Sequence, residues 1–263
     1  MNILFLSPSF PGEMNHYVQA LTAAGAKVWG VTDQPWLALP ERTREALAGV
    51  LHVFGFGDER EVVDTVVQQV RNRGLVIDGV EALWEPLVLP AATIREALGL
   101  PGMSVEVVRR FRDKELMKAV LREAGLRVPR SSRETSADGI RGAAEAIGFP
   151  LIVKPIAGAG SADTHRVDDA QALEGVVDQL HHVPEVSVEE FVDGEEFTYD
   201  TLCVDGVPVY ENVAQYLPRP LVARTDEGCS PIIVTLKDLS APRLTDGIAL
   251  GRAVLGALGM GTG

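Results

Sequence analysis

The stretch GFPLIVKPIAGAGS, residues 148–161, carries a lysine at the end of a short apolar run and then a loop of small residues. An apolar run bounded by prolines predicts a buried strand, here Pro150–Pro155. A lysine on such a strand is costly unless an anion neutralises it, and small residues beyond it let backbone amides approach phosphate oxygens. The segment therefore indicates an anion site at Lys154, although a lysine that emerges into solvent before an ordinary loop would give the same pattern.

Two further segments lie on either side of this one. Upstream, Asp113 and Lys114 open a predicted helix, and an N-cap followed by a solvated lysine is enough to explain them. Downstream, VEEFVDGEEFT (residues 188–198) places acidic pairs around a turn at Asp193-Gly194. Most acidic runs are solvated. A carboxylate can nevertheless accept hydrogen bonds from both ribose hydroxyls, and an extended backbone can pair with an adenine edge.

Outside these segments, the first part of the chain alternates short apolar strands with amphipathic helices. The predicted strands are Asn2–Leu6, Lys27–Val31, Val50–Phe54 and Val80–Trp84, and the predicted helices are Tyr17–Ala24, Arg60–Val70 and Pro90–Leu98. This order predicts a parallel sheet wrapped by helices.

The pattern becomes less regular after Gly102. Helices are predicted at Asp113–Ala124, Ala137–Ile147, Ala170–Leu180 and Leu244–Leu258, and strands at Arg127–Pro129, Pro150–Pro155, Phe197–Val204 and Val207–Tyr210. The last two strands form a predicted hairpin that turns at Asp205-Gly206. We interpret this second part as an α+β unit.

The order of the three segments resembles the ATP-grasp superfamily. DKELMKAVLREAGLRVPR (113–130) is similar to the opening helix and strand of that family, residues 149–161 to its lysine strand and phosphate loop, and residues 188–198 to its adenine hinge and ribose carboxylate. The region with Glu85, Ala91-Ala92 and the linker Leu98–Gly102 resembles the Rossmann-like domain that precedes them. The resemblance implies an α/β protein: a Rossmann-like parallel-sheet domain at 1–103, then an α+β ATP-grasp domain at 104–263 that is incomplete at its C-terminus.

The resemblance also implies a role for individual residues. ATP would be bound by Lys114, Lys154, Gly158, Gly160, Ser161, Glu189, Glu190, Phe191, Val192 and Glu196. The two lysines would contact phosphates, the hinge would pair with adenine mainly through its backbone, and Glu196 would hold the ribose. Glu85 matches a position that faces the acceptor substrate, and Arg219 and Arg224 are catalytic candidates for binding a substrate carboxylate. A structural strand-end acid and two solvated loop arginines are the alternatives.

The function implied is that of a ligase in which ATP activates a carboxylate as an acyl phosphate and an amine or similar nucleophile displaces the phosphate. Magnesium is expected as cofactor, yet no residue here matches the family's magnesium carboxylates. They are expected beyond Gly263, so the chain is expected to be a fragment that is not competent alone; the alternative is that the metal is held differently. The alternative is a nucleotide-binding module without turnover, with a regulatory or assembly role.

Composition limits the partners. The formal net charge of -13 repels phosphate backbones, so nucleic acid is not an expected partner. No apolar run is long enough to span a membrane. The two cysteines, Cys203 and Cys229, are interpreted as unpaired thiols in a reducing compartment, so a cytoplasmic protein is expected. The expected partners are small-molecule carboxylates and amines, and a homodimer is left open.

Overall fold

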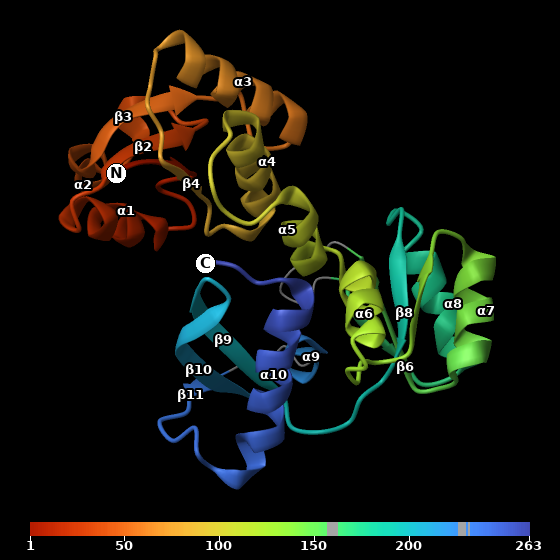
Figure 1. The fold of residues 1–263 in the computed structure, drawn as a ribbon. Helices are drawn as coiled ribbons and strands as arrows, with labels where there is room; N and C mark the ends of the chain where they lie inside the picture. Colours follow the sequence, from red (N-terminus) through yellow and green to blue (C-terminus); the bar gives the residue numbers. More distant parts are fainter. Residues whose placement is uncertain (157–162, 226–229, 231) are drawn as a thin grey trace. The chain divides into compact units, whose positions relative to one another are not determined.

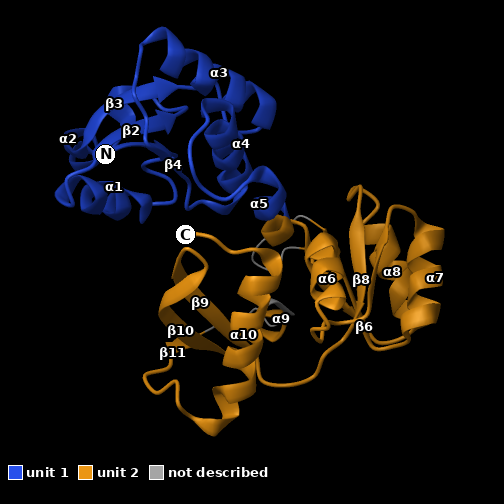
Figure 2. Ribbon diagram, viewed as in Figure 1, with its two compact units in different colours: residues 1–109 blue, residues 110–263 orange. Residues whose placement is uncertain are grey.

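The computed structural model describes residues 1–156, 163–225, 230 and 232–263. The chain divides into two compact units, Met1–Arg109 and Arg110–Gly263 (Figure 2). The predicted domain boundary after residue 103 falls just before helix α5 (Val105–Arg112), and the units divide within that helix. Within the described residues, no helix combines the length and the apolar character needed to cross a membrane.

Unit 1 is built on a parallel sheet of four strands in the order β3-β2-β1-β4. The strands are β1 (Asn2–Leu6), β2 (Lys27–Thr32), β3 (Leu47–His52) and β4 (Gly79–Glu81). Four of the five residues of β1 are buried, because both faces of the sheet are covered. The parallel sheet predicted from the alternating pattern is confirmed.

Helices cover both faces of this sheet (Figure 1), and two hydrophobic clusters fill the space between them and the sheet. Leu4 and Leu6 pack with valines of helix α3, whereas Phe5, on the other face of the same strand, packs with Val18 of helix α1. The helices are α1 (Met14–Ala23), α2 (Glu41–Ala46), α3 (Glu59–Asn72) and α4 (Val88–Leu98), with short 3₁₀ turns η1 (Trp36–Ala38) and η2 (Glu85–Leu87). Alternation along β1 therefore places successive side chains in different cores.

Unit 2 contains a first sheet of four antiparallel strands in the order β5-β8-β6-β7. Its strands are β5 (Ser131–Glu134), β6 (Leu151–Pro155), β7 (His165–Val167) and β8 (Val186–Glu190). Helices α7 (Ala137–Ile147) and α8 (Ala170–Gln179) cover one face, and α6 (Lys114–Glu123) lies on the other (Figure 1).

The two faces of this first sheet differ in chemistry. Leu151 and Val153 of β6 and Val186 and Val188 of β8 belong to the apolar core under α7 and α8. The intervening side chains, including Ser187 and Glu189, face the opposite way, toward α6. Because side chains alternate along a strand, β8 presents an apolar face and a polar face that are both buried.

A second sheet of three antiparallel strands, β11-β10-β9, completes unit 2 beside a long helix (Figure 1). The elements are β9 (Phe197–Val204), β10 (Val207–Leu217), α9 (Pro220–Thr225), β11 (Ile232–Thr235), η3 (Pro242–Leu244) and α10 (Thr245–Leu258). The predicted hairpin turn is confirmed: Asp205 and Gly206 both have positive φ, 49° and 78°. Positive φ at both central residues is what a type I′ hairpin turn requires.

The structure corrects one predicted strand. Residues 127–129 are not in a strand, and β5 begins instead at Ser131. The start of β5 follows its pairing with β8, in which Ser131 lies opposite Glu189. Pro129 has no N–H to offer a ladder, which explains why the pairing starts beyond it.

Candidate functional site

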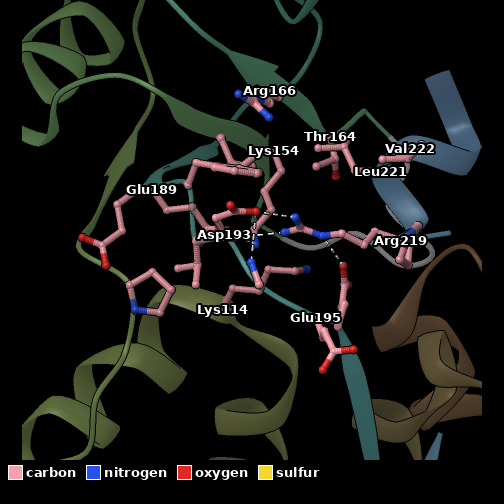
Figure 3. Close-up of a pocket in the computed structure, with 18 of the residues that line it drawn as sticks. Lys114, Lys154, Thr164, Arg166, Glu189, Asp193, Glu195, Arg219, Leu221 and Val222 are labelled. Carbon is pink, nitrogen blue, oxygen red and sulfur yellow. Dashed lines mark hydrogen bonds and ion pairs between the residues drawn. The ribbon is translucent and has the colours of Figure 1, made fainter. Parts of the chain in front are cut away.

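Unit 2 contains a cleft of about 680 Å³ beside its first sheet. It is lined by Lys114 of α6, by Ile152 and Lys154 of β6, by the segment Glu189–Glu196 and by Arg219 near the end of β10. Further lining residues are Pro129, Pro155, Thr164, Arg166, Pro220, Leu221 and Val222. Figure 3 shows Lys114, Lys154 and Arg219 directed into this cleft from different elements. Together with Arg166 of β7, four cationic side chains from separate elements therefore line one cavity.

The two predicted phosphate lysines lie in this cleft on neighbouring elements. Lys114 is the first residue of α6, and its Nζ donates a hydrogen bond of 3.0 Å to the carbonyl of Ile156. Asp113 caps the helix, as predicted, by accepting from the amides of Glu115 and Leu116 at 3.0 Å. Lys154 is on the side of β6 that faces away from the apolar core, and it forms an ion pair with Glu189. Cap and strand thus position both ammonium groups.

A buried ionic cluster lies behind Lys154, and most of it was not expected from the sequence. Lys118 is buried, and its Nζ contacts Glu115 Oε1 at 2.6 Å, Ser187 Oγ at 3.0 Å and Glu189 Oε2 at 2.5 Å. Ser131 Oγ donates to the other oxygen of Glu115 at 2.8 Å. Burial acts to raise the pKa of Glu115, but hydrogen bonds from Lys118, Ser187 and Ser131 outweigh it, so the pKa is lowered.

One signal in the sequence was available for this cluster. Lys118 follows Lys114 by four residues, which places both on the same side of a helix. Ser187 and Glu189 are two residues apart, which places both on the same side of a strand. The spacing of the two lysines fits one face of a helix, and the spacing of Ser187 and Glu189 fits one face of a strand. Nothing in the sequence showed that these two faces pack together.

Glu190 has a different environment from Glu189. Its carboxylate accepts from Arg127 at 2.7 Å and from Arg130 at 2.9 Å. Hydrogen bonds from Arg130 and Arg127 hold the pKa of Glu190 below its ordinary value. The side chain of Glu190 thus serves a surface ion pair, and only its backbone is available to the cleft in the way the hinge prediction requires.

The hinge segment beyond Glu190 is contacted by two arginines. The guanidinium carbon of Arg166 lies 4.3 Å from the ring centroid of Phe191, and that of Arg219 lies 5.4 Å from it. Arg219 also donates to the carbonyl of Val192 at 3.0 Å and to Asp193 Oδ1 at 2.9 Å. Its Nε is 3.9 Å from Glu196 Oε2. The structure therefore places Arg219 against the hinge, and its predicted contact with a substrate carboxylate stays a prediction.

For five other predicted site residues, the described part of the structure gives no contact with the cleft. Glu85 opens η2 in unit 1 and is not among the residues that line the cleft. Gly158, Gly160 and Ser161 lie outside the described residues. Arg224 is on α9, and its side chain is outside what the structure describes. The roles predicted for these five residues stay predictions.

The acids of the cleft do not form a metal site. In the described ranges, which exclude 157–162, 226–229 and 231, no three or more His, Cys, Asp or Glu side chains are grouped so as to hold a metal ion. The acids of the cleft are instead paired with lysines and arginines. We therefore assign no magnesium ligand in this part of the chain.

Comparison with known proteins gives the family. The family model for the ATP-grasp N-terminal domain matches residues 18–102, and the model for the carbamoyl-phosphate synthase L chain, ATP binding domain, matches residues 113–196. The chain belongs to the ATP-grasp superfamily. The second match to this ATP-grasp chain begins at the cap of α6 and ends at Glu196, so it contains both lysines and the hinge.

Individual relatives of this ATP-grasp chain are ligases and synthases. The carbamoyl phosphate synthase large chain of Mycobacterium sp. (strain JLS) is 33% identical over 173 residues, which are 62% of this chain and 16% of that protein. Alanine–anticapsin ligase of Bacillus subtilis (strain 168) is 30% identical over 150 residues, 52% of this chain and 31% of that protein. The chain therefore spans less than a third of the length of these two relatives.

A solved structure resembles the whole chain. The crystal structure of an L-amino acid ligase from Bacillus licheniformis superposes with a TM-score of 0.74 at 22% sequence identity. The match covers 100% of this chain and 61% of the ligase. At this level of identity the likeness establishes the fold, which is the α/β class expected from the sequence.

Proposed function

We propose that this chain is the nucleotide-binding part of an ATP-dependent ligase that activates a carboxylate as an acyl phosphate and joins it to an amine. The observation that supports this proposal most is the cleft of unit 2, where Lys114 and Lys154 flank the hinge Glu189–Glu196. The relatives named as ligases and synthases support the reaction class. Because the chain spans only part of those relatives, the activity belongs to the whole protein.

In this proposal the nucleotide lies with its phosphates at the lysines and its nucleoside at the hinge. Lys154 and Lys114 neutralise phosphate oxygens, which is the main task of a protein in phosphoryl transfer. The extended backbone of Glu190–Val192 pairs with the adenine edge, and the carboxylate of Glu196 accepts from the ribose hydroxyls. Gly158, Gly160 and Ser161 are proposed to cover the phosphates, as in the family.

The substrates are proposed to be a small carboxylate and a small amine. The acyl phosphate forms when a carboxylate oxygen attacks the γ-phosphorus and ADP leaves, and the amine then displaces phosphate to give an amide. Arg219, Arg224 and Glu85 are the proposed contacts to these substrates. A divalent ion, when bound, would neutralise the charge between the transferring phosphates. No described residue is assigned to hold it, and no step is assigned to it.

Calorimetric titration with ADP tests the nucleotide site directly. We expect saturable binding that is lost or strongly weakened in Lys154→Ala. For the reaction, the whole protein is incubated with ATP, mixed amino acids and hydroxylamine, which intercepts acyl phosphates as hydroxamates. Hydroxamate formation together with ADP supports the ligase. A folded chain that binds no ADP would contradict the proposal, and ADP binding without hydroxamate would favour a nucleotide-binding module without turnover.

A further inference from the structure

The buried ionic cluster of Glu115, Lys118, Ser187 and Glu189 lies behind the cleft. Three of these residues are at most 7% exposed, namely Lys118 (7%), Ser187 (0%) and Glu189 (7%). Burying charges at this depth costs free energy that only close pairing returns. Lys118 is not among the residues that line the cleft, so contact with a ligand in the cleft does not account for its burial.

The ammonium of Lys118 has all of its hydrogen-bonding capacity engaged. A lysine ammonium has three donors. Its three partners are Glu115 Oε1 at 2.6 Å, Ser187 Oγ at 3.0 Å and Glu189 Oε2 at 2.5 Å. Lys118 is therefore a fixed cation, held by one residue of its own helix and two of β8.

Glu189 divides its two carboxylate oxygens between two lysines. Oε2 accepts from Lys118, and Oε1 accepts from Lys154. Only one of these lysines is turned toward the cleft: the side chain of Lys154 is 23% exposed, against 9% for Lys118. An anion that enters the cleft therefore competes with Glu189 for Lys154, but not for Lys118.

We propose that Lys118 is a positioning residue that keeps Glu189 neutralised, so that Lys154 can turn from this carboxylate to a phosphate without leaving a buried charge unpaired. The proposal rests on the nucleotide site proposed above. Without Lys118, Glu189 would have Lys154 as its sole cation in the cluster, and each phosphate contact of Lys154 would be made at the expense of that pair.

Glu115 is the second carboxylate that contacts Lys118. Lys154 and the cluster together contain two carboxylates, Glu115 and Glu189, and two ammonium groups, so they have no net charge. When Lys154 turns to a phosphate, Lys118 stays between both carboxylates, and the hydroxyls of Ser131 and Ser187 continue to donate to Glu115. The remaining charges thus stay hydrogen-bonded throughout.

The test is a set of ADP titrations by calorimetry on wild type, Lys118→Met, Glu189→Gln and the double variant. Lys118→Met should raise the dissociation constant at least tenfold, although Lys118 does not line the cleft. Glu189→Gln should bind ADP more tightly than Lys118→Met, because the amide that replaces the carboxylate has no charge to hold Lys154. The double variant should return to within about threefold of wild type.

A matched control separates this effect from general damage to α6. Arg122 is one turn further along the same helix and donates to Ser131 Oγ at 2.7 Å. Arg122→Met should leave the dissociation constant within twofold of wild type. If Lys118→Met does not fold, Lys118→Gln replaces it in both the single and the double variant. A double variant that binds ADP no better than the single Lys118 variant would overturn the proposal.

A second measurement needs no nucleotide, so it separates this inference from the proposed function. If wild type binds no ADP, the proposed function fails, whereas urea unfolding still tests whether Lys118 neutralises Glu189. The double variant should then unfold at a higher urea concentration than Lys118→Met. Losses that simply add in the double variant would show that the two charges are not coupled and would overturn the inference.

Discussion

The guanidinium of Arg219 donates a hydrogen bond of 3.0 Å to the main-chain carbonyl of Val192. Arg219 follows the end of β10, whereas Val192 belongs to the hinge that follows β8, so this contact ties the second sheet of unit 2 to the connection between the two sheets. A second hydrogen bond, to Asp193 Oδ1 at 2.9 Å, fixes the guanidinium plane. The hinge backbone is thus held by a side chain from outside it.

Arg219→Met should loosen the hinge and weaken ADP binding by roughly 1 kcal/mol, about fivefold, because a partly exposed charged hydrogen bond contributes about that much. Calorimetric titration measures the effect. Arg166→Met is the matched control, since Arg166 also stacks on Phe191 but pairs with Asp168 rather than with the hinge carbonyl. Equal losses in the two variants would show that stacking matters rather than the hydrogen bond to Val192.

Lys154→Ala should weaken ADP binding by roughly 1.5–3 kcal/mol, because it removes a charge-assisted contact to phosphate. Lys27→Ala is a suitable control, since Lys27 lies in unit 1 beside the ring of Trp29. Both variants are titrated with ADP under the same salt conditions. Unchanged affinity in Lys154→Ala would exclude Lys154 from the phosphate site.

Glu196→Gln should weaken the binding of ADP but have little effect on 2′,3′-dideoxy-ADP, because only the former offers hydroxyls to the carboxylate. The neighbouring acid provides the control: Glu195 accepts from Gln215 at 3.2 Å and lies 3.6 Å from Arg243. Glu195→Gln should change neither affinity by more than about twofold. A similar loss for both nucleotides in Glu196→Gln would mean that Glu196 does not contact the ribose.

Unit 2 should lose stability in acid through Glu211. Hydrogen bonds from Arg252 and Tyr199 lower the pKa of Glu211 from 4.5 to about 2. Because the folded-state pKa is the lower one, this contribution to stability is present above about pH 4.5 and is lost as the pH falls toward 2. The difference in unfolding free energy between wild type and Glu211→Gln should be constant above about pH 5 and shrink below it.

Urea unfolding followed by far-ultraviolet circular dichroism measures this difference. The three tryptophans, Trp29, Trp36 and Trp84, all belong to unit 1, so their fluorescence reports that unit separately. Glu123→Gln, at an exposed acid on α6, is the control and should differ from wild type equally at all pH values. A difference for Glu211→Gln that persists at the lowest pH would refute the assignment.

Elements with a strong local signal were predictable from the sequence. Ala137–Ile147 is a helix as predicted, with Ser136 as its cap. Gly25 and Gly125 directly follow the predicted helices Tyr17–Ala24 and Asp113–Ala124, with φ of 90° and 73°. Both glycines adopt a left-handed conformation that other residues rarely take. Strands β7 and β11 were missed, because His165–Val167 and Ile232–Thr235 are short and depend on their partners for pairing.

Residues of the cleft that belong to a family motif were predictable from the sequence. Residues whose contacts depend on how elements pack together were not. The positions of Lys154 and the hinge in one cleft follow from the order of the motifs. Lys118, by contrast, sits in DKELMK, a sequence that is typical of a solvated helix start, and only the packing of α6 against β8 buries it. Arg219 likewise has the sequence context of a loop arginine, and only the fold brings it to Val192.

Side chains alternate between two buried faces along β8, at Val186, Ser187, Val188 and Glu189. The number of residues in this strand is therefore tightly constrained. Adding or removing one residue would turn the two valines toward the lysines and drive the carboxylate into the apolar core beneath α7 and α8. A substitution at a single position disturbs one face of the strand only. A one-residue shift in register exchanges the side chains of both faces at once. We therefore expect natural variation in this strand to proceed by exchange of residues and not by insertion or deletion of one.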